Sequence, residues 1–302
     1  MARVKDIEAR ALAQSAQRQQ LQPEPQQLPI WEDDLRGFPN GIARTSLFTA
    51  AKHDSGSQKR EFYRDPKQLA SLSNITINYR GQELRQDDAS VFMTLLHMAR
   101  MTPLGEPVRF TAYGMLKELG WSVNSQEYKH LRECCARLQF TSLTISTTDE
   151  SGGGYSGSLI ADFQWQDEKG NKLDHWFITL VPTIAKLFAP DSYTLYDWQI
   201  RRRIGGRSPL AQWLHYFIGT HSKPYPMSIQ KYYELSGSRA RDLADFRRRF
   251  KQALQKLVDV GFLAGFQVIN DIVTVTREPL RYPAPQIAAP QAEPEQHDLL
   301  AA

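Results

Sequence analysis

Apolar residues recur at helical spacing in two blocks of the chain that lie about 115 residues apart. The first block opens with "QDDASVFMTLLHMARM", in which Val91, Leu95 and Met98 mark one face of a helix. Asp87 or Asp88 can cap its start. A short β-type run, "PVRF", a short helix, "TAYGMLKEL", a turn, "WSVN", and a longer helix, "SQEYKHLRECCARL", follow in that order.

The second block repeats this order. It contains a helix, "SPLAQWLHYFIGTH", a short strand, "YPMSI", and a short helix, "QKYYELSG", for which we expect Ser228 to be the N-cap. The turn "SRAR" leads into the long helix "DLADFRRRFKQALQKLVDVGFL". A repeat of this length is too long for a solenoid and indicates a duplicated domain.

Strand-like segments follow each long helix. In the first block these are "FTSLTIS", a Gly-rich loop "ESGGGYSG", and a hairpin made of "SLIADFQWQ" and "LDHWFITLV". In the second block a two-stranded ribbon turns at Asn270-Asp271. Short helix, turn, longer helix and β-ribbon form a winged helix-turn-helix, whose second helix enters the DNA major groove. We therefore expect an α+β fold of two tandem winged helix-turn-helix domains.

The two ends of the chain have a different composition. The start is rich in Gln and Pro and the end in Pro and Ala, which disfavours a packed core. We expect a flexible N-terminal arm and a disordered C-terminal tail. The expected segments are an arm at 1–60, one winged-helix domain at 61–190, a second at 191–278, and a tail at 279–302.

The long helix of the second block has one packed and one polar face. Steps of three and four place its apolar residues on one stripe: Leu243, Phe246, Phe250, Leu254 and Leu257. The polar residues expected to contact DNA are Arg241, Asp245, Arg248, Gln252 and Gln255, with Arg249 beside them. Arginine, glutamine and aspartate can each recognise a base edge, and Arg239, which precedes the helix, can hold a phosphate.

A run of arginines is more often a solvated helix face than a binding surface. Here the run lies on the long helix of a helix-turn-helix pattern, which favours DNA. The chain has a net charge of +4 and a pI near 9.0, so an acidic partner is plausible.

The long helix of the first block has a weaker basic face. Its candidate DNA contacts are Gln126, Lys129, His130, Arg132 and Arg137. We expect mainly phosphate contacts there, and the alternative is a domain that serves for dimerisation or support. Between the blocks, "DWQIRRRIGGRSPL" places Arg201, Arg202, Arg203 and Arg207 in a basic patch. Two interpretations remain: the patch binds phosphate between the domains, or it is a charged interdomain connection that binds no ligand.

The sequence lacks the common motifs of nucleotide-binding, metal and catalytic sites. It has no Walker motif, no H-E-x-x-H and no paired-cysteine metal pattern, and Cys134 and Cys135 are adjacent in a helical pattern. A nicking initiator needs a histidine pair, and no H-x-H occurs beside Tyr63 or elsewhere. We expect no catalysis, no metal and no cofactor. Neither a secretory signal nor an apolar run of about 18 residues is present, so we expect a cytoplasmic protein with no membrane partner.

Several long segments resemble the TrfA-type plasmid replication initiators, and more loosely the other tandem winged-helix plasmid initiators. They are "RTSLFTA", "LRQDDASVFMTLLHMAR", "LFAPDSYTLYDWQIRR", "SPLAQWLHYFIGTH" and "LADFRRRFKQALQKLVDVGFL". The resemblance implies binding to iteron repeats at a plasmid origin and opening of an adjacent A·T-rich segment, with single-stranded origin DNA as a further partner. It also implies recruitment of the host initiator, the replicative helicase and the polymerase sliding clamp. It further implies an active monomer, a restraining dimer, and DNA contacts by both long helices.

The resemblance bears on Ser46, Leu47 and Phe48, which match the end of a sliding-clamp-binding pentapeptide, although Arg44 replaces its first glutamine. An extended peptide of this kind places two apolar anchors in a preformed cleft. The alternative is that Leu47 and Phe48 pack onto the first domain. For the whole chain, the alternative to a replication initiator is a winged-helix transcriptional repressor, which needs no contact with the replication machinery. A nicking enzyme that uses Tyr63 is the third class.

Overall fold

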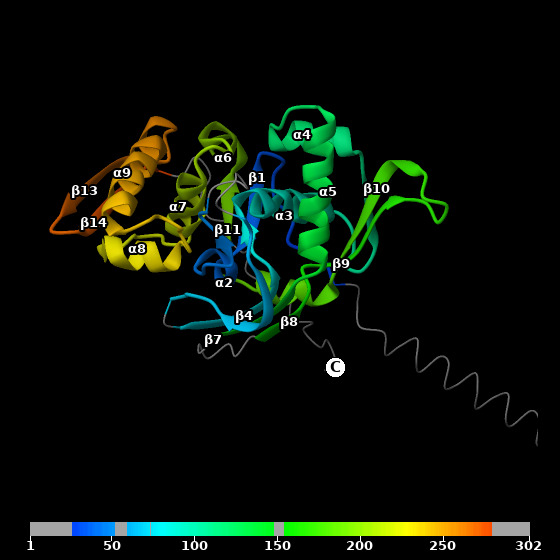
Figure 1. The fold of residues 1–302 in the computed structure, drawn as a ribbon, viewed down its shortest axis with the longest axis horizontal. Helices are drawn as coiled ribbons and strands as arrows, with labels where there is room; N and C mark the ends of the chain where they lie inside the picture. The colour runs from blue at the N-terminus through cyan, green and yellow to red at the C-terminus, as the bar shows by residue number, and fades with distance from the viewer. Residues whose placement is uncertain (1–25, 52–58, 73, 148–153, 280–302) are drawn as a thin grey trace, which may run out of the picture.

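The computed structural model describes residues 26–51, 59–72, 74–147 and 154–279, and its fold is α+β (Figure 1). The described part contains five sheets, with strand orders β1-β11, β2-β5, β3-β4-β7-β8, β6-β10-β9 and β12-β14-β13. In this part, no helix is both long enough and apolar enough to cross a membrane.

The first repeated unit is a group of three helices and a three-stranded sheet. Its elements are α3 (Gln86–Ala99), β6 (Pro107–Phe110), α4 (Ala112–Leu119), α5 (Ser125–Gln139), β9 (Ile160–Gln166) and β10 (Lys172–Leu180). β9 and β10 form an antiparallel hairpin, and β6 pairs with β10 on its other side.

The second unit has the same order and the same sheet topology. Its elements are α7 (Pro209–Gly219), β12 (Met227–Ser228), α8 (Ile229–Leu235), α9 (Leu243–Asp259), β13 (Leu263–Ile269) and β14 (Ile272–Arg277). Here β14 pairs with both β12 and β13, as β10 pairs with β6 and β9. The internal repeat expected from the sequence is therefore present in the structure.

Side-chain caps fix where these helices begin. As expected, the Ser228 hydroxyl accepts a hydrogen bond from the Lys231 amide at the start of α8. Asn124 and Asp242 cap α5 and α9 in the same way. In α3 the N-cap residue is Arg85, and the Asp88 carboxylate accepts from its backbone amide at 2.8 Å.

A four-stranded sheet interrupts the first unit. It consists of β3 (Phe62–Gln68), β4 (Ile75–Gln82), β7 (Ser142–Thr147) and β8 (Gly154–Gly157). The expectation that "ESGGGYSG" is a loop is wrong at 154–157, because these residues pair with β7. Tyr155 is 2% exposed, so a buried aromatic residue gives this Gly-rich strand its packing.

The prediction of a flexible arm over 1–60 is wrong for residues 26–51, which belong to the folded core. They form β1 (Leu35–Pro39), α2 (Asn40–Ala43) and β2 (Phe48–Thr49). β1 pairs along its whole length with β11 (Tyr193–Asp197), and β2 pairs with β5 (Leu84–Arg85). Trp31, Phe38 and Phe48 are buried, which supplies the apolar contacts that the Gln/Pro-rich composition does not suggest. The rest of the predicted arm at 1–25 and 52–58, and the predicted tail after Pro279, lie outside the described residues.

Two short helices connect the units. They are the 3₁₀ helix η1 (Pro182–Phe188) and α6 (Trp198–Ile204), which Asp197 caps. Helices α3 and α7 contact each other, and buried residues of both units form one continuous apolar core. The two units are thus held as one packed body in which α5 and α9 lie on either side of the α3–α7 region (Figure 1).

Candidate nucleic-acid interface

The exposed face of α9 carries the cationic row expected from the sequence. Phe246, Phe250 and Leu257 on its opposite face are fully buried against the second unit. The Arg241 side chain is 86% exposed and that of Arg248 is 64% exposed, so a ligand in solvent can reach both of them. Gln252 and Gln255 follow them on the same face and are also exposed.

Asp245 organises this row. Its carboxylate accepts from Arg248 and from Arg249, each at 2.7 Å. The hydrogen bond from Arg249 is the main reason that the pKa of Asp245 falls to about 2. In this arrangement Asp245 orients two arginines, whereas the sequence had suggested that it accepts a hydrogen bond from the amino group of a cytosine. Together with Arg241 and Ala244 these side chains line a shallow, open depression.

The long helix of each unit is attached to its own hairpin through an arginine. Arg247 of α9 donates from Nε to Oδ1 of Asp271, in the β13–β14 turn, at 3.0 Å. In the first unit the Arg132 guanidinium lies 4.3 Å from the ring centroid of Trp165, on β9. In each unit, the long helix and its hairpin are therefore held together and form one surface.

On α5, the structure separates the four predicted contacts other than Arg132 into two groups. Gln126 and Lys129 are exposed, and Lys129 lies 3.8 Å from Glu133. His130 and Arg137 face inward, so their prediction as DNA contacts is wrong for this conformation. His130 lies 3.0 Å from the Asp87 carboxylate, and Arg137 donates to Asp88 at 2.9 Å.

The inward-facing group forms a buried charge network at the start of α3. Arg60 pairs with Asp87 and Asp88 at 2.6 Å each. The hydrogen bond from His130, with the charges of Arg60 and Arg137, holds the pKa of Asp87 well below its usual range despite burial. The network explains why the adjacent aspartates, which the sequence marked only as a helix start, also anchor α5 to α3.

Ligand atoms of Asp87, His130 and Cys134 lie within 4.8 Å of one another, close enough for a metal ion. Two guanidinium groups already contact this cluster, and Arg137 donates to the Cys134 sulfur at 3.1 Å. Burial also raises the pKa of the Cys134 thiol, which disfavours the thiolate that a metal would bind. The donor set therefore suits internal ion pairing better than a cation.

The interdomain arginines differ in their exposure. Arg202, Arg203 and Arg207 are exposed, and a methyl group added at Gly120 would lie 3.4 Å from Nε of Arg202. Arg202 therefore reaches the α4–α5 turn. Arg201 is 2% exposed, and its prediction as a phosphate ligand is wrong because its guanidinium is used internally. It donates to the hydroxyl of Ser90 and to the carbonyl oxygens of Gln86 and Gln212.

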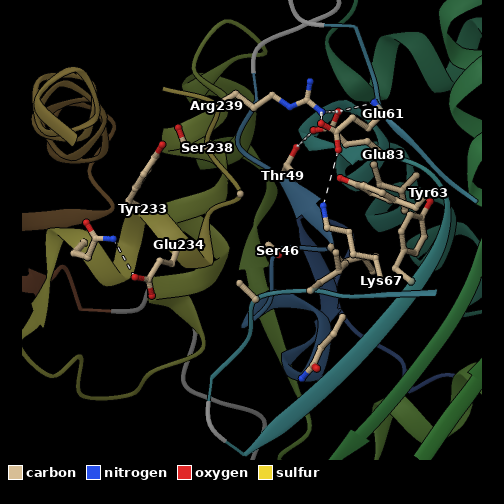
Figure 2. A pocket seen from close by; sticks show the side chains of 18 residues that line it. Ser46, Thr49, Glu61, Tyr63, Lys67, Glu83, Tyr233, Glu234, Ser238 and Arg239 are labelled. Atoms are coloured by element: carbon tan, nitrogen blue, oxygen red, sulfur yellow. Dashed lines mark hydrogen bonds and ion pairs between the residues drawn. The ribbon is translucent and has the colours of Figure 1, made fainter. Parts of the chain in front are cut away.

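Arg239, the predicted phosphate ligand of the α8–α9 turn, contacts the first unit instead. Its guanidinium lies 2.9 Å from Glu83 and 3.2 Å from Glu61, over a hollow of about 360 Å³ between the units (Figure 2). Glu83 is 2% exposed and had no signal in the sequence, because its partners Thr49 and Arg239 come from distant segments. In this conformation Arg239 joins the two units and is not available to DNA.

The segment that contains Ser46, Leu47 and Phe48 lies in the core, so its prediction as an exposed clamp-binding peptide is wrong for this conformation. Leu47 is 2% exposed and Phe48 is 1% exposed. The Phe48 carbonyl oxygen accepts from Gln86 of α3 and Tyr216 of α7. The packing alternative holds, and the segment joins both units rather than the first one alone.

Tyr63, the candidate nucleophile, packs edge-on against Tyr79 at 6.1 Å. The Lys67 ammonium lies 4.3 Å from its ring centroid. Partial burial raises the pKa of Tyr63 to about 12, which opposes formation of the attacking phenolate. These contacts favour the structural role.

The surface described above can be compared with known proteins. The plasmid replication initiator protein TrfA of Escherichia coli is 32% identical over 248 residues, which cover 82% of this chain and 63% of that relative. A crystal structure of domains 2 and 3 of RctB aligns with a TM-score of 0.53 at 12% identity, covering 80% of this chain and 98% of the other. At that identity the likeness shows the fold alone. The sequence model of the TrfA protein matches residues 2–277, and the chain therefore belongs to the TrfA family.

Proposed function

We propose that this chain is a plasmid replication initiator that binds iteron repeats in double-stranded origin DNA through two tandem winged helix-turn-helix domains. The relative from Escherichia coli is named a plasmid replication initiator protein, and the present chain spans 63% of that relative's length. The duplicated helix-turn-helix and hairpin, with matching sheet orders, supports the tandem arrangement.

The exposed row on α9 is the observation that carries the proposal. A helix buried on one side by Phe246 and Phe250 projects Arg241, Arg248 and Arg249 from the other side. Because Asp245 holds two of these guanidinium groups in place, less side-chain freedom is lost when they bind base edges or phosphates.

The remaining cations support a division of roles. We assign base recognition to α9, and phosphate contacts to Arg202, Arg203 and Arg207 together with Lys129 on α5. Arg202 extends the basic surface of the α6–α7 connection to the α4–α5 turn of the first unit. This continuity favours a single DNA duplex that contacts both units.

Origin opening, binding of the resulting single-stranded A·T-rich DNA, recruitment of the host initiator and the replicative helicase, and a monomer–dimer equilibrium belong to the proposal through the family. The protein would act in the cytoplasm, as a binding protein with no reaction of its own. Clamp binding at 46–48 is not included, because these residues are buried between the units.

Footprinting on the origin of the parent replicon tests DNA binding. We expect protection of the repeats, steep loss of affinity with added salt, and reduced discrimination against a scrambled repeat in Arg248→Ala. Gln230→Ala, on the exposed side of α8, is the control. Unchanged discrimination in Arg248→Ala would remove α9 as the recognition helix.

A transcriptional repressor with the same fold would bind the same DNA. Supplying the protein in trans to a plasmid that carries the origin without its own copy of the gene separates the two functions. Maintenance of that plasmid supports initiation, whereas repeat binding without maintenance supports the repressor.

A further inference from the structure

Two exposed isoleucines lie at the tip of the β13–β14 hairpin. Ile269 is 64% exposed and Ile272 is 43% exposed, and the two are paired across the turn. Residues opposite each other in an antiparallel pair project from the same face, so the two side chains form one apolar tip. The matching β9–β10 turn, "DEKGN", has only polar and glycine residues, all of them exposed. An apolar tip is therefore a feature of the second unit and not of the repeat.

The tip is held in a fixed position. Asn270 and Asp271 both have positive φ angles, of 49° and 62°, as in the tight two-residue turns that match the twist of a hairpin. Arg247 of α9 binds the Asp271 carboxylate, and the amide of Ile229 in α8 donates to the Asp271 carbonyl oxygen at 2.8 Å. Contacts with two helices thus hold the turn of the hairpin in place, and β13 and β14 lie beside α9 in Figure 1.

Cationic side chains flank the tip. Arg247 lies beside it, and Lys251, one turn further along α9, is close enough for its charge to lower the pKa of Asp271. Arg248, the next residue on α9, belongs to the exposed row. An apolar tip with cations at its side matches DNA, in which phosphates surround stacked apolar bases, better than it matches an apolar protein surface.

We propose that Ile269 and Ile272 form a wedge that enters the minor groove beside the major-groove segment read by α9 and partly unstacks a base step there. The inference rests on the proposed function and adds deformation of the DNA to it. Apolar side chains inserted in this way bend the duplex, and the cost of unstacking is least at flexible pyrimidine–purine steps. The wedge would thus favour repeats with such a step at a fixed distance from the bases that α9 contacts.

The test uses the full chain and a duplex of about 30 base pairs that carries one origin repeat, labelled at both ends for energy transfer. Bending is read from the end-to-end distance, and unstacking from 2-aminopurine placed at successive steps. We compare the wild type with Ile269→Thr/Ile272→Thr, which keeps β-branched residues in the hairpin. Ile30→Thr is the matched control, because Ile30 is 68% exposed and lies in another part of the fold.

We expect the double variant to bind the repeat about tenfold more weakly, to bend it less, and to lose the 2-aminopurine signal. Its salt dependence should stay as in the wild type, because no cation is removed. Equal bending and equal 2-aminopurine signals in the wild type and the double variant would overturn the wedge while leaving the proposed function intact. Loss of self-association in sedimentation, with bending unchanged, would overturn it in favour of a protein contact. A wild type that does not prefer the repeat over a scrambled duplex would overturn both proposals.

Discussion

Arg239 and Glu83 join the two units of the protein across their junction. The guanidinium of Arg239, in the turn between α8 and α9, lies 2.9 Å from the Glu83 carboxylate, which is buried next to β5 (Figure 2). Glu83 also accepts from the Thr49 hydroxyl at 2.9 Å and pairs with Arg85 at 2.9 Å. A single carboxylate thus connects the N-terminal segment, the first unit and the α8–α9 turn of the second unit.

Removing either partner of this pair should have unequal effects on stability. Glu83→Gln takes a shared carboxylate away from two guanidinium groups, of which Arg85 is fully buried, and should cost about 3–5 kcal/mol. Arg239→Gln should cost only about 1 kcal/mol, because Glu83 keeps Arg85 and Thr49 and the Arg239 side chain is 26% exposed. Urea unfolding of both variants measures the difference. Equal losses would contradict the assignment of Glu83 as the centre of the junction.

Phe48 should be a main stabilising residue of the core. Its ring lies 6.0 Å from that of Phe38 and 6.3 Å from that of Phe92, and it is 1% exposed. Phe48→Ala should lower the free energy of unfolding by about 3–5 kcal/mol. Phe62→Ala is the control, because Phe62 is 66% exposed and its loss should change stability by less than about 0.5 kcal/mol. A Phe48→Ala variant as stable as the control would return this segment to the role of an exposed ligand.

The sequence was sufficient to predict the elements that depend only on residues close to one another in the chain. The stripe from Phe246 to Leu257 and the cap at Ser228 depend on residues within one helix, so periodicity and capping rules suffice for α8 and α9. The repeated order of elements gave the α+β class in the same way.

Features that depend on distant partners were not predicted. Phe48 is buried because Gln86 and Tyr216, which are far away in the sequence, donate hydrogen bonds to its carbonyl oxygen. No local sequence pattern predicts such contacts. The Gln/Pro-rich residues before it suggested an arm instead. The three arginines from 201 to 203 are alike in sequence, and only the packing of α6 against α3 and α7 decides which of them is buried.

Arg201 and Arg202 should therefore differ in what their loss changes. Arg201→Lys cannot keep all the hydrogen bonds to Ser90, Gln86 and Gln212, and should destabilise the protein by about 3 kcal/mol. Arg202→Ala should leave stability within about 0.5 kcal/mol of the wild type. It should also lower the number of ions released on DNA binding, which is measured from the salt dependence of the affinity, by about one. Thermal unfolding and salt titrations of repeat binding measure the two effects. The assignment is contradicted if Arg202→Ala unfolds more easily than Arg201→Lys.

His215 should make the protein sensitive to mild acid. Burial between Tyr196 and Phe262 keeps the pKa of His215 well below its usual value of 6.5, so the folded state holds this ring neutral. In the unfolded chain this histidine is protonated below about pH 6.5, so the unfolded state binds more protons than the folded state. The free energy of unfolding therefore decreases as the pH falls. His215→Phe should therefore flatten the loss of stability between about pH 6.5 and 5 by up to about 1.4 kcal/mol per pH unit, whatever its effect at neutral pH. Tyr196→Phe is the control, because it removes the hydrogen bond to the Tyr216 carbonyl oxygen but no group that titrates in this range. Urea unfolding at each pH gives the slopes, and equal slopes for His215→Phe and the wild type would show that His215 is not buried in its neutral form.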